Sequence, residues 1–272
     1  MPFFGSARPR VFAHRGGCAL GPENTIAAFD RGQASGADGL ELDVHLSADG
    51  VVVVCHDGTL DRTTDLSGPV AARTADELAR ADAGFRYRDA RGEHSFRGQG
   101  VGIPRLRDVL RRYPDIPTII EMKVDRPEMG LALAAEVAAA AAVERVCAAA
   151  DGARAIRALR AALPELETSA CRSEVRLALY RSWVGWPVGR AAYGGYQVPE
   201  TAGARRVVSP TFIRHAHLAG LEVQVWTVDD ETDMERLLAW GVDGLISNRP
   251  DAAVAVRDRF MSVRQSAFAS DR

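Results

Sequence analysis

ELDVHLSADGVVVVCHD, residues Glu41–Asp57, is the stretch that decides the fold. Apolar and polar residues alternate through its first half, so a strand here has one apolar face and one acidic face. Asp49-Gly50 is a two-residue hairpin signal, and a run of valines follows it. If these two residues form the turn, the returning strand places His56 opposite Asp43, with Glu41 on the same face. The pattern predicts two carboxylates beside an imidazole, although an ordinary solvated face of a β-meander explains it equally well.

Ionisable side chains also follow two other apolar segments that we expect to be strands. Residues 10–13 run directly into a His-Arg-Gly-Gly sequence, and residues 117–120 run into Glu-Met-Lys. Three expected strands therefore deliver ionisable groups at or near their C-terminal ends: His14 and Arg15, Glu41 and Asp43, and Glu121 and Lys123.

The chain from residue 103 onward alternates between helix-forming and strand-forming segments. Helices are expected at about 106–113, 127–142, 153–163, 173–183, 212–220 and 231–240. Strands are expected at about 118–122, 145–150, 167–171, 196–198, 221–228 and 243–247. With strands near Val11 and Leu40, these segments make eight βα units, the number that closes a parallel barrel. We therefore predict an α/β fold, a TIM (β/α)8 barrel, as a single domain over residues 1–272.

Three segments fall outside this alternation. Residues 58 to about 102 form an insertion after the second-strand hairpin, with a Thr74-x-x-Glu77 capping box before a short helix. The N-terminal residues MPFFGSARPR are expected to be a short exposed arm, and the tail from about 259 to 272 is expected to be exposed or frayed.

Composition narrows the class of protein. A formal net charge of −2 argues against a nucleic-acid partner, and 47% hydrophobic with 26% charged residues is typical of a globular protein. No transmembrane segment and no signal peptide are expected, so the predicted location is cytoplasmic. The four cysteines lack CxxC spacing, and we expect Cys18 and Cys55 to be buried side chains rather than nucleophiles.

Nine short motifs, in order from about residue 10 to residue 250, resemble those of the glycerophosphodiester phosphodiesterase family. They are His14-Arg15-Gly16, Pro22-Glu23-Asn24-Thr25, Glu41-Leu42-Asp43, His56-Asp57, Leu60-Asp61-Arg62-Thr63-Thr64, Ile103-Pro104-Arg105-Leu106, Glu121-Met122-Lys123, Val225-Trp226-Thr227-Val228 and Asp243-Gly244. The resemblance implies a phospholipase C-like TIM barrel, a divalent metal, and hydrolysis of glycerophosphodiesters to glycerol 3-phosphate and an alcohol. It also implies that the insertion packs over the barrel mouth. The alternative is that the insertion is a long surface loop without a functional role.

The three carboxylates Glu41, Asp43 and Glu121 are the expected metal ligands. Close carboxylates repel one another, and a hard cation resolves that conflict. Oxygen-only ligands favour one Mg²⁺ or Ca²⁺ over zinc. The alternative for each carboxylate is a salt bridge, for example between Glu121 and Lys123.

The resemblance also implies the catalytic groups. His14 and His56 are the expected acid–base pair, with the two roles left open, and Arg15 and Lys123 are expected to bind the phosphate. The other histidines (His45, His94, His215 and His217) are expected to be structural. Asp57 is a candidate to orient a neighbouring imidazole. No activated Ser or Cys is placed at the phosphorus, which leaves water or the substrate itself as the nucleophile. We predict attack by the 2-hydroxyl of the substrate, through a cyclic phosphate intermediate.

The pocket wall is less well defined by the sequence. Trp226 can form an apolar wall for glycerol or can belong to the core, and Gln197 and Glu200 can contact glycerol hydroxyls. Many relatives carry Thr-Asp where this chain has Ser247-Asn248, and Ser-Phe within its Ala148–Ala150 segment. We expect neither departure to touch the metal or acid–base residues.

We therefore predict a metal-dependent glycerophosphodiester phosphodiesterase whose partner is a small-molecule glycerophosphodiester substrate. A phospholipase D acting on lysophospholipids or sphingomyelin is the rival with the same site. An inactive barrel that binds a phosphorylated ligand is the rival of another class. The head group, the physiological metal and the oligomeric state cannot be read from the sequence.

Overall fold

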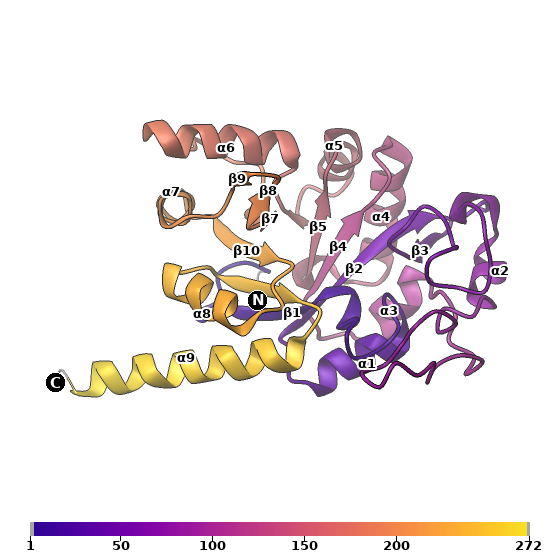
Figure 1. Ribbon diagram of the computed structural model, residues 1–272. Helices are drawn as coiled ribbons and strands as arrows, with labels where there is room; N and C mark the ends of the chain where they lie inside the picture. Colours follow the sequence, from indigo (N-terminus) through magenta and orange to yellow (C-terminus); the bar gives the residue numbers. More distant parts are fainter. Residues whose placement is uncertain (1–2, 271–272) are drawn as a thin grey trace.

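The computed structural model describes residues 3–270, with side chains through residue 266, and its centre is a parallel barrel (Figure 1). The eight barrel strands are β1 (Arg10–Ala13), β2 (Gly39–Leu46), β4 (Thr118–Met122), β5 (Val146–Ala150), β6 (Glu167–Thr168), β7 (Gly195–Pro199), β10 (Glu222–Trp226) and β11 (Gly244–Ser247). They are hydrogen bonded in the order β6-β5-β4-β2-β1-β11-β10-β7. A single parallel bridge between Ser169 and Gly195 joins the two ends, so the barrel is nearly closed. The predicted TIM-barrel fold is confirmed.

Helices follow the strands and cover the outside of the barrel (Figure 1). They are α1 (Ile26–Ala34), α3 (Leu106–Arg112), α4 (Pro127–Ala139), α5 (Ala153–Ala162), α6 (Arg172–Val184), α7 (Pro210–Leu218), α8 (Glu231–Trp240) and α9 (Pro250–Ser270). Thr25 caps α1 by accepting a hydrogen bond from the amide of Ala28, and Gly241 ends α8 in the left-handed conformation. None of the helices in residues 3–270 is long and apolar enough to cross a membrane. The cytoplasmic location stays a prediction.

The hairpin at β2 has a different register from the one predicted. β3 (Val52–Val54) pairs antiparallel to β2, with Val44 opposite Val54, and the amide of Cys55 donates to the carbonyl of Asp43. Cys55, not His56, therefore lies opposite Asp43. The loop contains three residues rather than two, because the Ser47 amide bonds to the Val51 carbonyl while Gly50 adopts a φ of 74°. This is a three-residue hairpin loop with a left-handed final residue.

The insertion packs against this hairpin. It contains the short helix α2 (Ala75–Ala79), with the predicted Thr74–Glu77 capping box, and the 3-10 turn η2 (Val70–Ala72). Its buried side chains form a small core of their own beneath β3: Leu60, Val70, Ala75, Leu78 and Ala83 with Val53, Cys55 and Ile103. Arg62 extends from this insertion toward Glu23 and Asp57 at the edge of the site.

The N-terminal arm is exposed over residues 5–8, as predicted, but its first described residue is buried; residues 1 and 2 lie outside the described residues. Phe3 is only 2% exposed, and its ring stacks on that of Phe12 of β1. Phe4 lies against Gly194 and Gly195, where an added Cβ at either glycine would approach its ring. The prediction failed at these residues because the barrel interior presents apolar side chains, including Ile119 and Ile246, that cluster with Phe3.

The C-terminal segment is helical rather than frayed. α9 continues through Ser270 and projects beyond the barrel in Figure 1. No proline or glycine interrupts residues 251–270, which explains why the helix continues. Residues 262–266 are exposed, as expected for this tail.

Candidate active site

A pocket of about 990 Å³ opens at the C-terminal ends of the barrel strands. Nine of the side chains predicted for the site line it: His14, Arg15, Glu41, Asp43, His56, Glu121, Lys123, Gln197 and Trp226. Residues 14 and 15 follow β1, residues 41 and 43 lie on β2, and residues 121 and 123 lie at the end of β4. The barrel therefore brings together groups that are more than two hundred residues apart in sequence.

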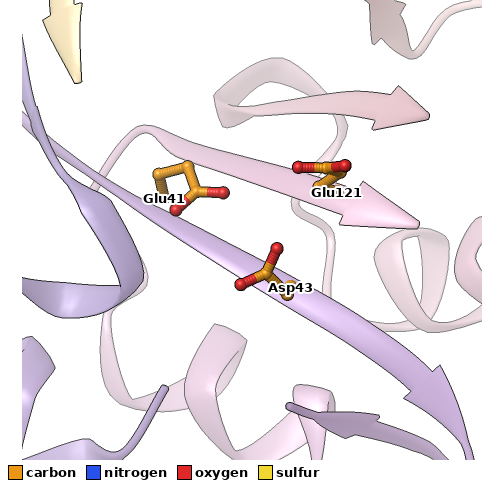
Figure 2. Close-up of side chains that lie close together, drawn as sticks. All are labelled: Glu41, Asp43 and Glu121. Atoms are coloured by element: carbon orange, nitrogen blue, oxygen red, sulfur yellow. The ribbon is translucent and has the colours of Figure 1, made fainter. Parts of the chain in front are cut away.

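The carboxylate cluster consists of Glu41, Asp43 and Glu121 (Figure 2). Asp43 lies opposite Glu121 in the parallel register of β2 and β4, and the three residues each offer an oxygen within 4.8 Å of the others. Glu41 and Asp43 are buried, at 4% and 1% exposure. Burial, reinforced by repulsion from Asp43 and Glu121, raises the pKa of Glu41 well above its ordinary value. Such a cluster suits a hard divalent cation, which favours all three ionised carboxylates.

Two cations also contact this cluster. Lys123 Nζ lies 3.1 Å from Asp43 Oδ1 and 3.1 Å from Glu121 Oε1, and Arg15 Nε lies 3.4 Å from Asp43 Oδ2. Burial alone would lower the pKa of Lys123, but the charges of Asp43 and Glu121 raise it. The salt bridge that we gave as the alternative for Glu121 is therefore present. Asn24 completes the shell of Asp43, since its Nδ2 donates to Asp43 Oδ2 over 2.9 Å.

The His-Arg-Gly-Gly sequence forms a tight turn, η1 (His14–Gly16), that aims two side chains into the pocket. Arg15 has a φ of 51°, and its amide donates to Glu41 Oε2 over 2.9 Å. Gly16 has a φ of 85°, and a Cβ there would lie 2.8 Å from the backbone nitrogen of Phe29. Glycine is thus required at position 16 both by the backbone conformation and by the close approach of α1.

His14 has a fixed tautomer. Asn248 Nδ2 donates to the carboxylate of Asp229 over 2.6 Å, which turns Asn248 Oδ1 toward His14 Nδ1, 2.6 Å away. Nδ1 therefore carries the proton, and Nε2 lies 3.9 Å from Glu41 Oε2. Burial lowers the pKa of His14, although the hydrogen bond to Asn248 opposes this effect. The ring is neutral near pH 7, with its Nε2 lone pair available.

The departure at Ser247-Asn248 thus touches the acid–base set, and our expectation that it does not was wrong. Asn248 begins the segment after β11, which pairs directly with β1 in the barrel. This pairing brings Asn248 to His14 across 234 residues of sequence.

His56 belongs to a separate hydrogen-bonded chain. Its Nδ1 donates to Asp57 Oδ1 over 2.6 Å, and Asp57 Oδ2 accepts from Arg62 Nε over 2.6 Å. The hydrogen bond from Arg62 foremost, with help from His56, lowers the pKa of Asp57 to about 2 although burial opposes this shift. Arg62 also donates to both carboxylate oxygens of Glu23, over 2.7 Å each. The permanently ionised Asp57 orients the imidazole so that its Nε2 is left free for the pocket.

The rest of the pocket wall contains both apolar and polar side chains. Trp226, 37% exposed at the end of β10, lines the pocket rather than the core. Gln197 donates from Nε2 to Gln224 Oε1 over 3.0 Å, while its own Oε1 is buried without a partner among the described residues. Glu200 is not at the site, because its carboxylate forms a two-pronged ion pair with Arg236, with both distances 2.9 Å. The suggested contact of Glu200 with glycerol is therefore wrong.

The thiols and the other histidines do not line the pocket, although the Cys18 thiol donates to Asn248 Oδ1 over 2.8 Å. Burial raises the pKa values of Cys18 and Cys55 to about 12, so neither thiol ionises at neutral pH. His217 is half exposed on α7 and bonds to Asp243. His45, His94 and His215 bond to backbone carbonyls of residues 56, 87 and 186.

Five polar residues around the site were given no role in it from the sequence: Glu23, Asn24, Arg62, Asp229 and Asn248. Glu23 and Asn24 lie within a motif that carried the resemblance, so their location in it was a usable signal. Asp229 offered no such signal, since its role depends on hydrogen bonds to Ser247 Oγ and to the amide of Asn248.

Comparison with known proteins identifies relatives over nearly the whole chain. Residues 14–252 match the model of the Glycerophosphoryl diester phosphodiesterase family. The glycerophosphodiester phosphodiesterase of Caldanaerobacter subterraneus is 31% identical over 249 residues, which cover 90% of this chain and 96% of that protein. The probable glycerophosphodiester phosphodiesterase 2 of Mycobacterium tuberculosis is 32% identical over 254 residues, or 89% and 88% of the two chains. Neither rival function gains support from these relatives.

Solved structures share the fold. The glycerophosphodiester phosphodiesterase of Agrobacterium tumefaciens has a TM-score of 0.73 and 29% identity, and the match covers 91% of this chain and 99% of that one. An Oleispira antarctica phosphodiesterase, solved in complex with its product sn-glycerol-3-phosphate, has a TM-score of 0.74 at 24% identity over 92% and 97% of the chains.

Proposed function

Because the chain belongs to the glycerophosphoryl diester phosphodiesterase family, and is thus a phosphodiester hydrolase, we propose that it releases glycerol 3-phosphate with the help of one divalent cation. The observation that carries this proposal is the cluster of Glu41, Asp43 and Glu121 in one pocket. Its oxygen-only donors suit Mg²⁺ or Ca²⁺. When bound, the cation would supply positive charge to the phosphate oxygens and lower the pKa of an attacking hydroxyl.

Arg15 and Lys123 would hold the phosphate of the substrate. Both side chains line the pocket and already lie beside the carboxylates, so a phosphate near the cation also falls within their reach. A guanidinium can donate two parallel hydrogen bonds to phosphate oxygens. Their charges oppose the negative charge that grows on these oxygens during cleavage.

His14 is the proposed base and His56 the proposed acid. The neutral His14 ring would take the proton of the attacking hydroxyl at Nε2 as the new bond to phosphorus forms. The bond from phosphorus to the alcohol oxygen then breaks, and His56 would deliver its proton to that oxygen. Where the 2-hydroxyl is the attacking group, water would next add to the cyclic phosphate as His56 takes its proton, and His14 would return a proton to the 2-oxygen as its bond to phosphorus breaks. Asp57 supports this second role, since its carboxylate accepts from Nδ1 and can stabilise a protonated ring.

The glycerol product would lie against Trp226, with Gln197 as a candidate partner for a hydroxyl. Gln197 lines the pocket and its Oε1 is a buried acceptor without a partner among the described residues, while Trp226 offers a flat apolar surface. The glycerol 3-phosphate named for the Oleispira antarctica neighbour is consistent with such a product.

Substitution of the two histidines tests this assignment. His14→Ala and His56→Ala should each lower turnover of glycerophosphocholine by about a hundredfold or more, within the range for acid–base groups. A nitrophenyl ester needs no proton on its leaving group, so it should restore the rate of His56→Ala and not that of His14→Ala. The matched control His217→Ala, which removes an imidazole outside the pocket, should retain its rate. Equal restoration of both variants would contradict the assignment of base and acid.

A further inference from the structure

The outer face of α6 carries a concentration of exposed apolar side chains. Leu177, Tyr180, Trp183 and Val184 are each 48–76% exposed, and Trp186, just past the helix end at Gly185, is 65% exposed. We call these five residues the aromatic patch. In the described part of the chain, the other exposed large apolar residues outside the pocket are Leu131, Leu218 and Val263, on α4, α7 and α9. Single residues of that kind need no explanation, whereas a patch of this composition does.

The patch follows helical spacing. Residues 177, 180 and 184 recur every three or four positions, so they lie on one side of α6. The rings of Tyr180 and Trp183 meet edge to face with centroids 5.2 Å apart. A different side of the same helix, with Val175 and Leu179, lines the pocket. α6 thus presents one apolar side to the pocket and another to the solvent.

The surroundings of the patch are cationic. Residues 172–206 contain six arginines and two glutamates, in a chain whose net charge is −2. Both glutamates are already neutralised, Glu174 by Arg160 and Glu200 by Arg236.

Four of the six arginines have no carboxylate partner within ion-pair distance among the described residues, and two of these four, Arg176 and Arg205, line the pocket. Arg205 also lies over the ring of Trp183, 5.9 Å from its centroid. Exposed aromatic rings beside unpaired arginines match the boundary between lipid head groups and acyl chains.

We propose that the aromatic patch docks this protein onto an anionic lipid bilayer. The tryptophans and Tyr180 would enter the head-group region while Arg176 and Arg205 face lipid phosphates, and the pocket would open beside the membrane surface. The charge argues against a second copy of this chain as the occupant. A two-fold interface would bring the same unpaired arginines of both copies together.

Vesicle co-sedimentation tests the proposal without reference to catalysis. The protein should sediment with phosphatidylglycerol vesicles and not with phosphatidylcholine vesicles. Binding should weaken as salt shortens the Debye length from about 10 Å at 0.1 M to about 3 Å at 1 M. Trp183→Ser combined with Trp186→Ser should weaken binding by about tenfold or more. Arg176→Gln combined with Arg205→Gln should weaken it by about fivefold per charge.

Matched variants and a second measurement distinguish docking through the aromatic patch from a nonspecific loss of apolar surface or charge. Val263→Ser removes an equally exposed apolar residue from α9, and Arg91→Gln with Arg264→Gln removes two exposed charges elsewhere. All should bind vesicles like the parent. Brominated lipid should quench the fluorescence of the parent protein and lose that effect in the double tryptophan variant. Absence of vesicle binding, or a dimer that the tryptophan substitutions dissociate, would overturn the proposal.

Discussion

Asp43 is the most constrained residue of the site. It is 1% exposed, yet it contacts Lys123, Arg15 and Asn24 while sharing a cluster with two further carboxylates. The two cations offset part of the negative charge, but Glu41 keeps a strongly raised pKa. The metal-free site therefore contains an electrostatic conflict, which a divalent cation would relieve.

Glu41→Gln should lower the activity of the protein and raise its stability in chelator. Turnover should fall by more than about a hundredfold, which corresponds to roughly 3 kcal/mol of lost transition-state stabilisation. In chelator at pH 7, the variant should nevertheless unfold at a higher denaturant concentration than the parent. A carboxyl group whose pKa is raised by folding destabilises the protein once pH exceeds its unfolded value of about 4.5.

The pH dependence gives the sign of this effect. The gain in the free energy of unfolding of Glu41→Gln over the parent should grow as pH rises from 4.5 toward the raised pKa. It should vanish below pH 4.5, where the carboxyl of the parent is protonated in both the folded and the unfolded state. Denaturant unfolding across this range measures it. The exposed Glu128→Gln is the matched control, with no such advantage expected. A destabilised Glu41→Gln at pH 7 in chelator would show that Glu41 is not in conflict with its neighbours.

Asn248→Ala should lower the turnover number and leave KM close to its normal value. Loss of the amide leaves His14 Nδ1 without its hydrogen-bond partner, so the ring can rotate, while the groups proposed to bind phosphate stay in place. By analogy with residues that orient metal-bound imidazoles, the loss should be about ten- to a hundredfold. Steady-state kinetics would check this, together with a melting curve to verify folding. A folded variant with unchanged turnover would remove Asn248 from the account.

Only part of the site could be assigned from the sequence. The strand-end positions of His14, Glu41 and Glu121 were readable, because the C-terminal ends of barrel strands converge. Asn248 could not be assigned to His14, because their contact depends on the pairing of the first and last barrel strands and on the rotation of an amide fixed by Asp229.

The elements themselves were largely predictable. β4 and α8 begin and end at the predicted residues, since apolar periodicity and glycine or aspartate caps define them. The hairpin register was not predictable from Asp49-Gly50. The same dipeptide fits a two-residue and a three-residue loop, and the hydrogen bonds of Ser47 select the longer one. A shift of one residue moved His56 out of the position opposite Asp43.

Gly50→Ala should destabilise the protein by about 1 kcal/mol. Gly50 has a φ of 74°, and an added Cβ would meet no atom within 4 Å, so the cost is conformational rather than steric. Gly50→Asn is the matched variant and should cost less, because asparagine tolerates the left-handed region. Urea unfolding of the three proteins measures the difference. Equal stability of the alanine variant and the parent would mean that the loop adopts another conformation.

At the scale of the whole molecule, the barrel depends on contacts that no local pattern specifies. β6 and β7 meet through one bridge, and Phe3 clusters with apolar side chains of the barrel interior. A Phe-Phe pair near a chain terminus looks the same in sequence whether it is exposed or buried. Eight repeated βα units predicted the architecture, while the closure and the burial of Phe3 required the structure.

We propose that this barrel uses a cation held by three carboxylates to hydrolyse a glycerophosphodiester. The most direct measurement follows glycerol 3-phosphate released from glycerophosphocholine by the pure protein, first in chelator and then after Mg²⁺ or Ca²⁺ is added. We predict turnover that falls by at least about a hundredfold in chelator and returns with the cation, and that does not return in Glu41→Gln or Glu121→Gln. Undiminished release of glycerol 3-phosphate in chelator would contradict the account.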